Sequence, residues 1–505
     1  MAEILVLTII AALAAIYALL PTNKQLRIRY GPGPKTKIIL VSLSFFIILL
    51  SLLHSFFSNN YPNHTISIGP AYTSTFFLID TAQVVATLSI VGIFLNFLAI
   101  GSTTIADKEY FNEKIRELIN REEYTIAVEL LDEHYGEIFH SNSDDYSTLL
   151  KTIDTVLQEG NIIDEIARYH PEFALCILAD DDLDTISRST FASNYFEGLL
   201  EHDNSILYRE IWNSRNFIPS YHRYHIKDEN RLITTLFSDC ERAKDLAVYK
   251  PIGDWILDYL REQSAKDYDE YNDFDIKFGH DVDKTAFQDP IVASVHFFDI
   301  MVSESLYQGI KWHMWLYYYG RFTERICENF ENTENTDPTD EFPNRYGYIL
   351  TEIVRNQRRW IEAAEHDTDE LELRIEHADC RHENGDIIKS SLRCLCRCGR
   401  VILTTETIPS RLKENIGRNL YLPYFELTLS EDSQLEQYAE AYADCLEEQM
   451  DNMPNGEEFR RVFYGHLQNV RDDSVARSRV LYQDGGRQAM AEFRDRIEPE
   501  HGVES

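Results

Sequence analysis

Three long apolar runs near the start of the chain constrain its fold more than any other feature. They cover residues 4–20, 38–57 and 76–98, and Asp80 is the only Asp, Glu, Lys or Arg within them. A helix that crosses the hydrocarbon core of a bilayer needs about 20 mostly apolar residues, and these runs meet or approach that length. The sequence therefore predicts a membrane domain over residues 1–104 with three transmembrane helices.

The charges between the runs predict how the chain is oriented. Five basic and no acidic residues separate the first two runs: Lys24, Arg27, Arg29, Lys35 and Lys37. Residues 58–75, between the second and third runs, contain no Lys or Arg. Because cytoplasmic loops collect these residues, we expect the N-terminus outside the cell and the chain from Asp107 onward in the cytoplasm. No basic residue precedes the first run, so we interpret it as a retained span and not a cleaved signal.

Polar side chains inside the third run form its most informative feature. Asp80, Gln83 and Thr87 recur at helical spacing and share one face. An ionisable group in hydrocarbon costs about 2.5–3.5 kcal/mol on insertion scales and commonly faces water or a partner helix. One interpretation is a pore, proton-relay or gating face in a homo-oligomer. We favour the other, in which Asp80 reaches the nearby outer interface and Gln83 and Thr87 form hydrogen bonds across helices.

The rest of the chain is strongly acidic. The protein has 84 acidic and 48 basic side chains and a formal net charge of -36, and only two of its acidic residues precede Asp107. Lys is also scarce relative to Arg. A surface of this kind suits a cytoplasm of high salt, where self-repulsion is screened, so we infer a halophilic source as a hypothesis. The same charge argues against nonspecific nucleic-acid binding, since phosphate backbones require Lys and Arg.

Apolar residues after the third run recur at helical spacing, and alternating strand patterns are nearly absent. The first stripes are formed by Phe111, Ile115, Leu118, Ile126, Leu130 and Leu131. The sequence therefore predicts an all-α fold, in which the membrane helices precede a large and irregular multi-helix cytoplasmic region. We expect subdomains at residues 107–263 and 290–500, which could also form one continuous domain. Residues 264–289 lack periodicity and are predicted to be a loop or linker.

One segment of the cytoplasmic region is locally basic and rich in aromatic residues. Its arginines are Arg209, Arg215, Arg223 and Arg231, and they are interleaved with Tyr208, Trp212, Phe217, Tyr221 and Tyr224. Arginine forks hold phosphate and aromatic faces stack on bases, which would suit a nucleotide or another phosphorylated ligand. In so acidic a chain we favour the alternative, in which these arginines pair with nearby carboxylates.

A cluster of thiols provides the ligand types that zinc requires. Its members are Cys380, His382, Cys394, Cys396 and Cys398. Structural zinc favours four such ligands in tetrahedral geometry, commonly with two to four residues between a pair, whereas the gaps here are one residue. The pattern of residues 387–403 fits either a helix or a strand. In a helix, Cys396 would point away from Cys394 and Cys398. In a strand, the three thiols would share a face but spread over about 13 Å, too far for one ion. We therefore favour buried thiols over zinc. All eight cysteines follow the third run, and in a reducing cytoplasm we expect no disulfide framework.

No phosphate-binding glycine loop, nucleophile elbow or zinc-protease motif occurs in the chain, so no cofactor is expected. The leading hypothesis is a membrane-bound, non-catalytic sensor, scaffold or interaction module with an unidentified cytoplasmic protein or ligand as its partner. The alternative is an oligomeric ion channel or membrane-disrupting effector that the cytoplasmic region gates. A third hypothesis is an enzyme with a nucleotide- or metal-dependent site at the arginine segment or the cysteine cluster.

The acidic surface leads to a prediction about salt. We expect the thermal midpoint of the purified protein, followed by far-ultraviolet circular dichroism, to rise steeply with KCl. The reason is that the Debye length falls from about 10 Å at 0.1 M salt to about 3 Å at 1 M. Sucrose, which does not screen charge, serves as the control. A midpoint that is equally high in dilute buffer would remove the halophilic hypothesis.

Overall fold

The structure is a computed structural model that describes most of the chain. The described residues are 11, 15, 17–19, 34–61, 65–68, 71–99, 105, 108–140, 147–183, 187–218, 223–271, 284–310, 315–331, 342–363, 387–430, 433–471, 480–483 and 485–499. They are predominantly helical, which confirms the predicted all-α character. Their strands form two short antiparallel pairs: β1 (Thr65–Ile68) with β2 (Ala71–Ser74), and β3 (Phe217–Ile218) with β4 (Arg223–Tyr224).

The chain divides into two compact units. The first contains residues 1–173 and 181–187, and the second contains residues 174–180 and 188–505. The boundary between the two units therefore lies at α10 (Pro171–Ala179) and the residues that follow it. The described residues on both sides of the predicted linker at 264–289 belong to the second unit.

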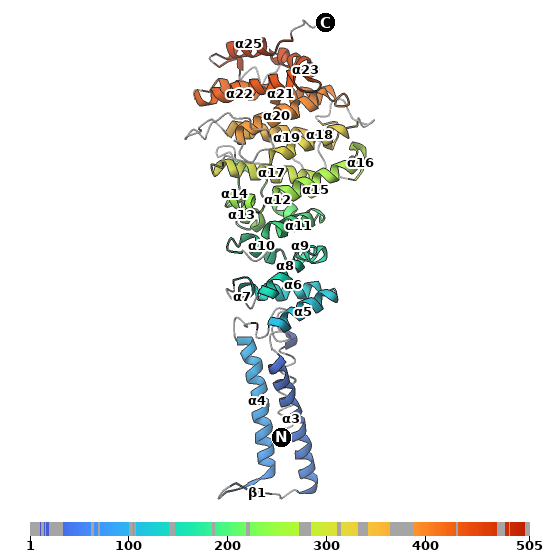
Figure 1. Ribbon diagram of the computed structural model, residues 1–505, viewed down its shortest axis with the longest axis vertical. Coiled ribbons are helices and arrows are strands. Elements are labelled where there is room, and N and C mark those ends of the chain that lie inside the picture. Colours follow the sequence, from blue (N-terminus) through green and yellow to red (C-terminus); the bar gives the residue numbers. More distant parts are fainter. Residues whose placement is uncertain are drawn as a thin grey trace. The chain divides into compact units, whose positions relative to one another are not determined.

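A helical hairpin forms the N-terminal part of the first unit (Figure 1). Helix α3 (Pro34–Asn60) and helix α4 (Thr75–Ala99) pack side by side and are joined through β1 and β2. Within the described residues, two segments are long and apolar enough to cross a membrane, Ile38–Phe57 and Thr75–Ile93. They match the second and third runs. Most of the first run, 4–20, lies outside the described residues. The transmembrane helix predicted there, which would bring the number of spans to three, is not confirmed.

The two hairpin helices expose many of their large apolar side chains, whereas their buried residues include polar side chains as well as Ile47, Leu50 and Ile79. Val41 and Phe45 are 69% and 67% exposed, whereas Gln83 is fully buried. Other exposed apolar side chains are Ile38, Ile48, Leu52, Phe56, Phe77, Val85 and Leu88. Ile47 packs against Ala86 in the seam between the helices. The hairpin therefore presents a largely apolar outer surface and buries polar side chains between its helices, whereas a helix pair that faces water is polar on the outside.

The rest of the first unit consists of short amphipathic helices. They are α5 (Lys108–Asn120), α6 (Tyr124–Glu133), α7 (Tyr135–Phe139), α8 (Ser147–Val156), α9 (Gly160–Tyr169) and the start of α10. Helix α5 packs on α6 and α8, and α6 packs on α9. The stripe predicted from Phe111, Ile115 and Leu118 is confirmed, because all three are buried. Glu122, at the bend between α5 and α6, has a φ of 60°.

The second unit contains the larger helical core (Figure 1). Its first helices are α11 (Arg188–Leu200), α12 (Ile206–Asn213), α13 (Arg231–Phe237), α14 (Cys240–Asp245), α15 (Tyr249–Glu262), α16 (Ala265–Tyr271), η3 (Lys284–Gln288), α17 (Pro290–Tyr307) and α18 (Leu316–Glu328). They are followed by α19 (Arg345–Glu362), α20 (Ile387–Thr404), α21 (Ser410–Thr428), α22 (Ser433–Asp451), α23 (Gly456–Gln468), η5 (Asn469–Arg471) and α25 (Gly486–Ile497).

Helix α20 is the centre of this core. It packs against α18, α19, α21, α22 and α23, and most of its side chains are buried. The sequence left residues 387–403 open between helix and strand, and the structure shows a helix. Gly399 allows a close approach of α21, because a Cβ at this position would lie 2.5 Å from the Leu420 side chain. A helix with neighbours on most of its sides is expected to belong to the interior of a protein.

The prediction of a loop over residues 264–289 is wrong for its first part, since residues 265–271 form α16. The helix is held by Tyr268, whose ring stacks on Tyr346 with 4.7 Å between centroids. The Tyr268 hydroxyl donates a 2.6 Å hydrogen bond to Asp289 Oδ1. One buried aromatic residue therefore stabilises a helix that has too few apolar residues to show a period.

Candidate functional site

Polar side chains from both hairpin helices meet in the seam between α3 and α4. Gln83 Nε2 donates a 2.8 Å hydrogen bond to Ser51 Oγ. One turn nearer to the β1–β2 end, His54 Nδ1 lies 3.0 Å from Asp80 Oδ1. The residue number rises by three on α3 and falls by three on α4, which is the register of two antiparallel helices. These pairs hold the helices together along one polar face.

The seam accommodates the three polar residues that the sequence singled out. Asp80 and Gln83 contact α3, and Thr87 Oγ1 donates a 2.8 Å hydrogen bond to the backbone carbonyl of Gln83. Thr87 is 2% exposed, whereas the Asp80 side chain keeps 37% of its surface exposed. Ser51 and His54 were not predicted as site residues. Their spacing of three residues in the second run places them on one face of a helix, and this pattern could have indicated them.

The arginine segment contributes one partly buried ion pair. Arg223, on β4, donates to both carboxylate oxygens of Glu304 on α17, with N–O distances of 3.3 and 2.8 Å. The Arg223 guanidinium also lies 4.0 Å from the ring centre of Tyr307. Since Glu304 is 1% exposed, its charge depends on this partner. Arg223 therefore binds a carboxylate of its own chain.

The other three arginines have exposed side chains. Arg215 lies 3.5 Å from the ring centre of Trp212 and donates a 3.0 Å hydrogen bond to its backbone carbonyl. Arg209 lies on α12 and Arg231 at the start of α13. The four predicted ligand-binding arginines therefore occupy separate local environments.

A buried polar network lies beside this segment. Asp299, on α17, is fully buried and accepts hydrogen bonds from the Tyr224 hydroxyl, from Arg359 Nη2 at 2.5 Å and from Trp360 Nε1 at 2.9 Å. The Arg359 guanidinium lies 4.7 Å from the ring centre of Phe217. The network therefore joins β3 and β4 to α17 and α19. Burial is the largest influence and lowers the Arg359 pKa, but Asp299, Tyr224 and Glu352 together outweigh it and raise this pKa above its usual value.

Two other buried carboxylates bind the ends of helices. Glu210 Oε2 accepts a 3.0 Å hydrogen bond from Ile233 N on α13, and burial raises the Glu210 pKa to about 7. Asp289 Oδ1 accepts from Ile291 N at 3.0 Å and Val292 N at 2.9 Å, and burial raises its pKa to about 6. Because these pKa values are raised, each group stabilises the fold less as the pH rises toward 6–7, where it ionises.

The described thiols of the cysteine cluster point to different sides of α20. Cys394 Sγ and Cys398 Sγ lie 3.9 Å apart, and Cys398 Sγ accepts a 3.3 Å hydrogen bond from Thr323 Oγ1 on α18. Burial opposes ionisation of Cys398, but hydrogen bonds from Cys394, Thr323 and Gln357 lower its pKa. Cys396 interacts instead with Cys445 on α22, and burial raises its pKa strongly.

This arrangement bears on the zinc hypothesis. In the part of the chain that the structure describes, no three His, Cys, Asp or Glu side chains are grouped so as to hold a metal ion. Cys380 and His382 lie outside that part. The described cluster therefore provides one pair of thiols on one face of α20, and Cys396 is directed elsewhere, as expected for a helix.

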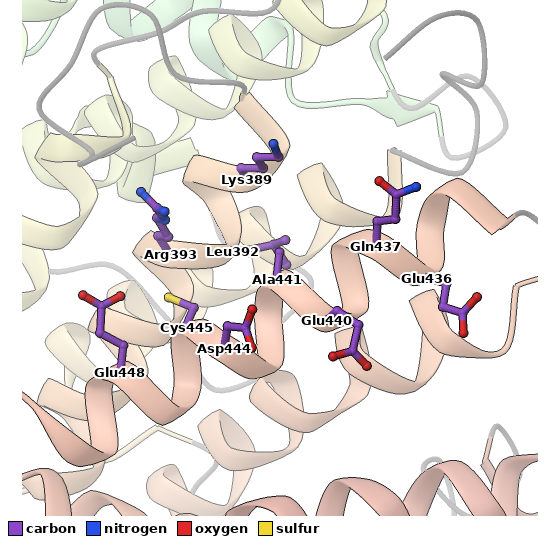
Figure 2. A pocket seen from close by; sticks show the side chains of 10 residues that line it. All are labelled: Lys389, Leu392, Arg393, Glu436, Gln437, Glu440, Ala441, Asp444, Cys445 and Glu448. Carbon is purple, nitrogen blue, oxygen red and sulfur yellow. The ribbon is translucent and has the colours of Figure 1, made fainter. Parts of the chain in front are cut away.

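A groove of about 510 Å³ lies between α20 and α22. Figure 2 shows Lys389 and Arg393 on its α20 wall, and Glu440, Asp444 and Glu448 on α22. The acidic wall is partly neutralised by this chain itself, because Arg496 on α25 forms ion pairs with Glu440, Asp444 and Glu447. The groove thus has walls of opposite charge.

Comparison with known protein families, with curated proteins and with solved structures finds no match to this chain.

The Asp299 network predicts a large effect of one conservative substitution. Asp299→Asn keeps the shape of the side chain but leaves the Arg359 charge without its main partner. Breaking a buried pair in this way costs about 3–5 kcal/mol, so we expect the free energy of unfolding to fall by that amount in urea denaturation of the full chain in detergent.

The matched control for this substitution is Asp258→Asn. Asp258 is 69% exposed and forms a surface ion pair with Arg261, so its loss should cost about 0–1 kcal/mol. If Asp299→Asn unfolds at the same urea concentration as Asp258→Asn, the network does not anchor β3 and β4 as described.

Proposed function

We propose that this chain is a multi-pass membrane protein whose acidic helical region acts in the cytoplasm as a non-catalytic sensor, scaffold or interaction module. The observation that carries the proposal is the reversed polarity of the hairpin. Its large apolar side chains point outward, whereas Ser51, Gln83 and Thr87 lie in or near the seam. In water this surface would be costly, since apolar burial contributes about 25 cal/mol per Å². In hydrocarbon the same surface is favourable.

The proposal includes the first apolar run, residues 4–20, as a transmembrane helix in addition to α3 and α4. Its described residues are helical, and Ala11, Ala15 and Ala18 have exposed side chains that could form a small-residue packing face. In the seam, Gln83 Oε1 is buried and has no hydrogen-bond partner within the described residues. An additional helix beside the seam would supply packing and a donor to this oxygen.

The role of a non-catalytic module is supported by the buried charges of the second unit, because they form ion pairs within the chain. Glu304 pairs with Arg223, and Asp299 pairs with Arg359. These contacts connect helices that are distant in sequence. The interaction surface of such a module would be the acidic exterior, which suits a partner of positive charge.

The alternative proposal is a homo-oligomeric channel or membrane-disrupting effector. The pair of His54 and Asp80 favours it, because both side chains are partly exposed, at 24% and 37%. Neighbouring copies could bring several such pairs together around a pore. An enzyme that uses the arginine segment or the cysteine cluster remains the third proposal.

The membrane orientation predicts which cysteines are reached from outside. Native Cys176 has an exposed side chain, and the chain contains no cysteine before it. Tyr61 is 53% exposed at the end of α3, so Tyr61→Cys places a thiol at the hairpin turn. A membrane-impermeant maleimide added to sealed cells should label this introduced thiol but not Cys176, as read by peptide mass spectrometry. After permeabilisation, both should react.

The unmodified chain in permeabilised cells is the control for the reactivity of Cys176. Labelling of Cys176 in sealed cells, without labelling at position 61, would show that the orientation is inverted. Labelling at both positions would show that α4 does not cross the membrane.

The channel alternative makes a separate prediction in liposomes. If the hairpin only anchors the protein, purified full chain in sealed liposomes should not release trapped ions, and Asp80→Asn should change nothing. Ion release that requires Asp80 would favour the channel instead. Gramicidin-treated liposomes provide the positive control for ion release.

A further inference from the structure

A second groove, of about 530 Å³, lies in the first unit between α5 and α8. From α5 it is lined by Arg116, Ile119 and Asn120, and from α8 and the residues after it by Thr148, Lys151, Thr152, Thr155, Val156 and Glu159. A volume of this size is typical of sites for small ligands. Two cationic side chains, three hydroxyl groups and one amide therefore converge on one concave surface.

The groove is unusual for this chain because positive charge prevails in it. Acidic side chains outnumber basic ones by 84 to 48 over the whole sequence, yet the lining contains two cations and one carboxylate, Glu159. Arg116 is held in place, since its Nη2 donates a 3.0 Å hydrogen bond to Thr152 Oγ1. Lys151 has an exposed side chain at the rim.

The other charges of α5 are directed into pairs of their own. Glu117 contacts both Lys114 and Arg121, and none of these three side chains lines the groove. On α8, Asp154 accepts hydrogen bonds from Gln158 and from Ser187 N, and it does not line the groove either. Glu117 and Asp154, which lie close in sequence to Arg116 and Lys151, therefore have their contacts outside the groove.

We propose that this groove binds a phosphate-bearing anion. A guanidinium held by one hydrogen bond keeps further N–H donors for phosphate oxygens, and an ammonium adds a mobile point charge. The Asn120 side chain, which lines the groove, adds a polar group of the kind that fixes the orientation of a ligand. The hydroxyls of Thr152 and Thr155 donate instead to the backbone carbonyls of Thr148 and Lys151. A mainly apolar ligand would cover the Arg116 and Lys151 charges without offering them a counter-charge.

Two sources could supply this anion, a soluble phosphate compound or the headgroup of an anionic lipid. The lipid source rests on the proposed membrane location of α4. Only eight residues, 100–107, separate Ala99, at the end of α4, from Lys108, at the start of α5, so the two residues are nine Cα–Cα steps apart. A chain of that length spans at most about 32 Å, so α5 starts within reach of the membrane surface. Anionic headgroups on the cytoplasmic leaflet attract basic groups near it.

The test measures access to the groove directly. Thr155 lines the groove and is exposed, so Thr155→Cys places a reactive thiol there, and native Cys176 serves as an internal reference. The full chain is labelled with a maleimide in phosphatidylcholine nanodiscs, with and without inorganic pyrophosphate. It is also labelled in nanodiscs that contain phosphatidylglycerol. The salt concentration is the lowest at which the protein keeps its helical circular dichroism.

A bound anion should slow labelling at position 155 and leave Cys176 unchanged. The rate falls with the fraction of free groove, so ligand at about nine times its dissociation constant slows labelling about tenfold. Slowing by pyrophosphate identifies a soluble ligand, and slowing only by phosphatidylglycerol identifies a headgroup. If neither slows position 155 relative to Cys176, the proposal is overturned, and the proposed membrane topology is unaffected.

Charge-reversal variants show whether the cations of the groove cause the effect. Lys151→Glu in the Thr155→Cys background should abolish the slowing, with Lys151→Gln as a milder second variant. Arg121→Glu is the matched control, because Arg121 is 61% exposed directly after the end of α5, pairs with Glu117 and lies outside the groove. Each ratio is taken with and without ligand within one variant, which removes the direct effect of Lys151 on the thiol. Equal slowing in Lys151→Glu and Arg121→Glu would contradict the assignment.

Discussion

A polar group that leaves water must find a partner, and this requirement explains the arrangement of the hairpin. In apolar surroundings an unpaired amide or hydroxyl costs several kcal/mol, which explains why polar side chains of α3 and α4 meet in the seam between the helices. Gln83 and Ser51 share a hydrogen bond, and His54 lies against Asp80. The apolar residues are left to cover the outside. Both the proposed membrane location and the proposed orientation of everything after α4 depend on this arrangement.

The same requirement organises the second unit, where the partners are more distant in sequence. Asp299 on α17 is surrounded by Tyr224, Arg359 and Trp360, which come from β4 and α19. Charge that is buried but paired can fix one packing arrangement among several apolar alternatives. These contacts pair the buried charge of Asp299 within the chain. In contrast, the lining of the α5–α8 groove contains two cations, Arg116 and Lys151, and one carboxylate, Glu159.

Much of the fold could be predicted because it depends on local periodicity. The apolar runs, the helical stripes and the helix alternative for the cysteine segment all follow from residue spacing. Contacts between distant residues could not be predicted in this way. Nothing in the segment around Arg223 indicates that Glu304, 81 residues later, is its partner. Helix α16 was not predicted because it also depends on a contact between distant residues: the ring of Tyr268 stacks on a ring from α19.

The central claim is that the outer faces of α3 and α4 contact lipid and their shared face does not. Nitroxide side chains placed singly along Ile38–Phe57 and Thr75–Ile93 in a reconstituted bilayer test it most directly. Collision rates with dissolved oxygen should be highest at Val41, Phe45 and Val85, and lowest at Ser51 and Gln83, with helical periodicity. Strong relaxation of the Gln83 position by a water-soluble nickel complex, or collision rates without any periodicity, would contradict the account.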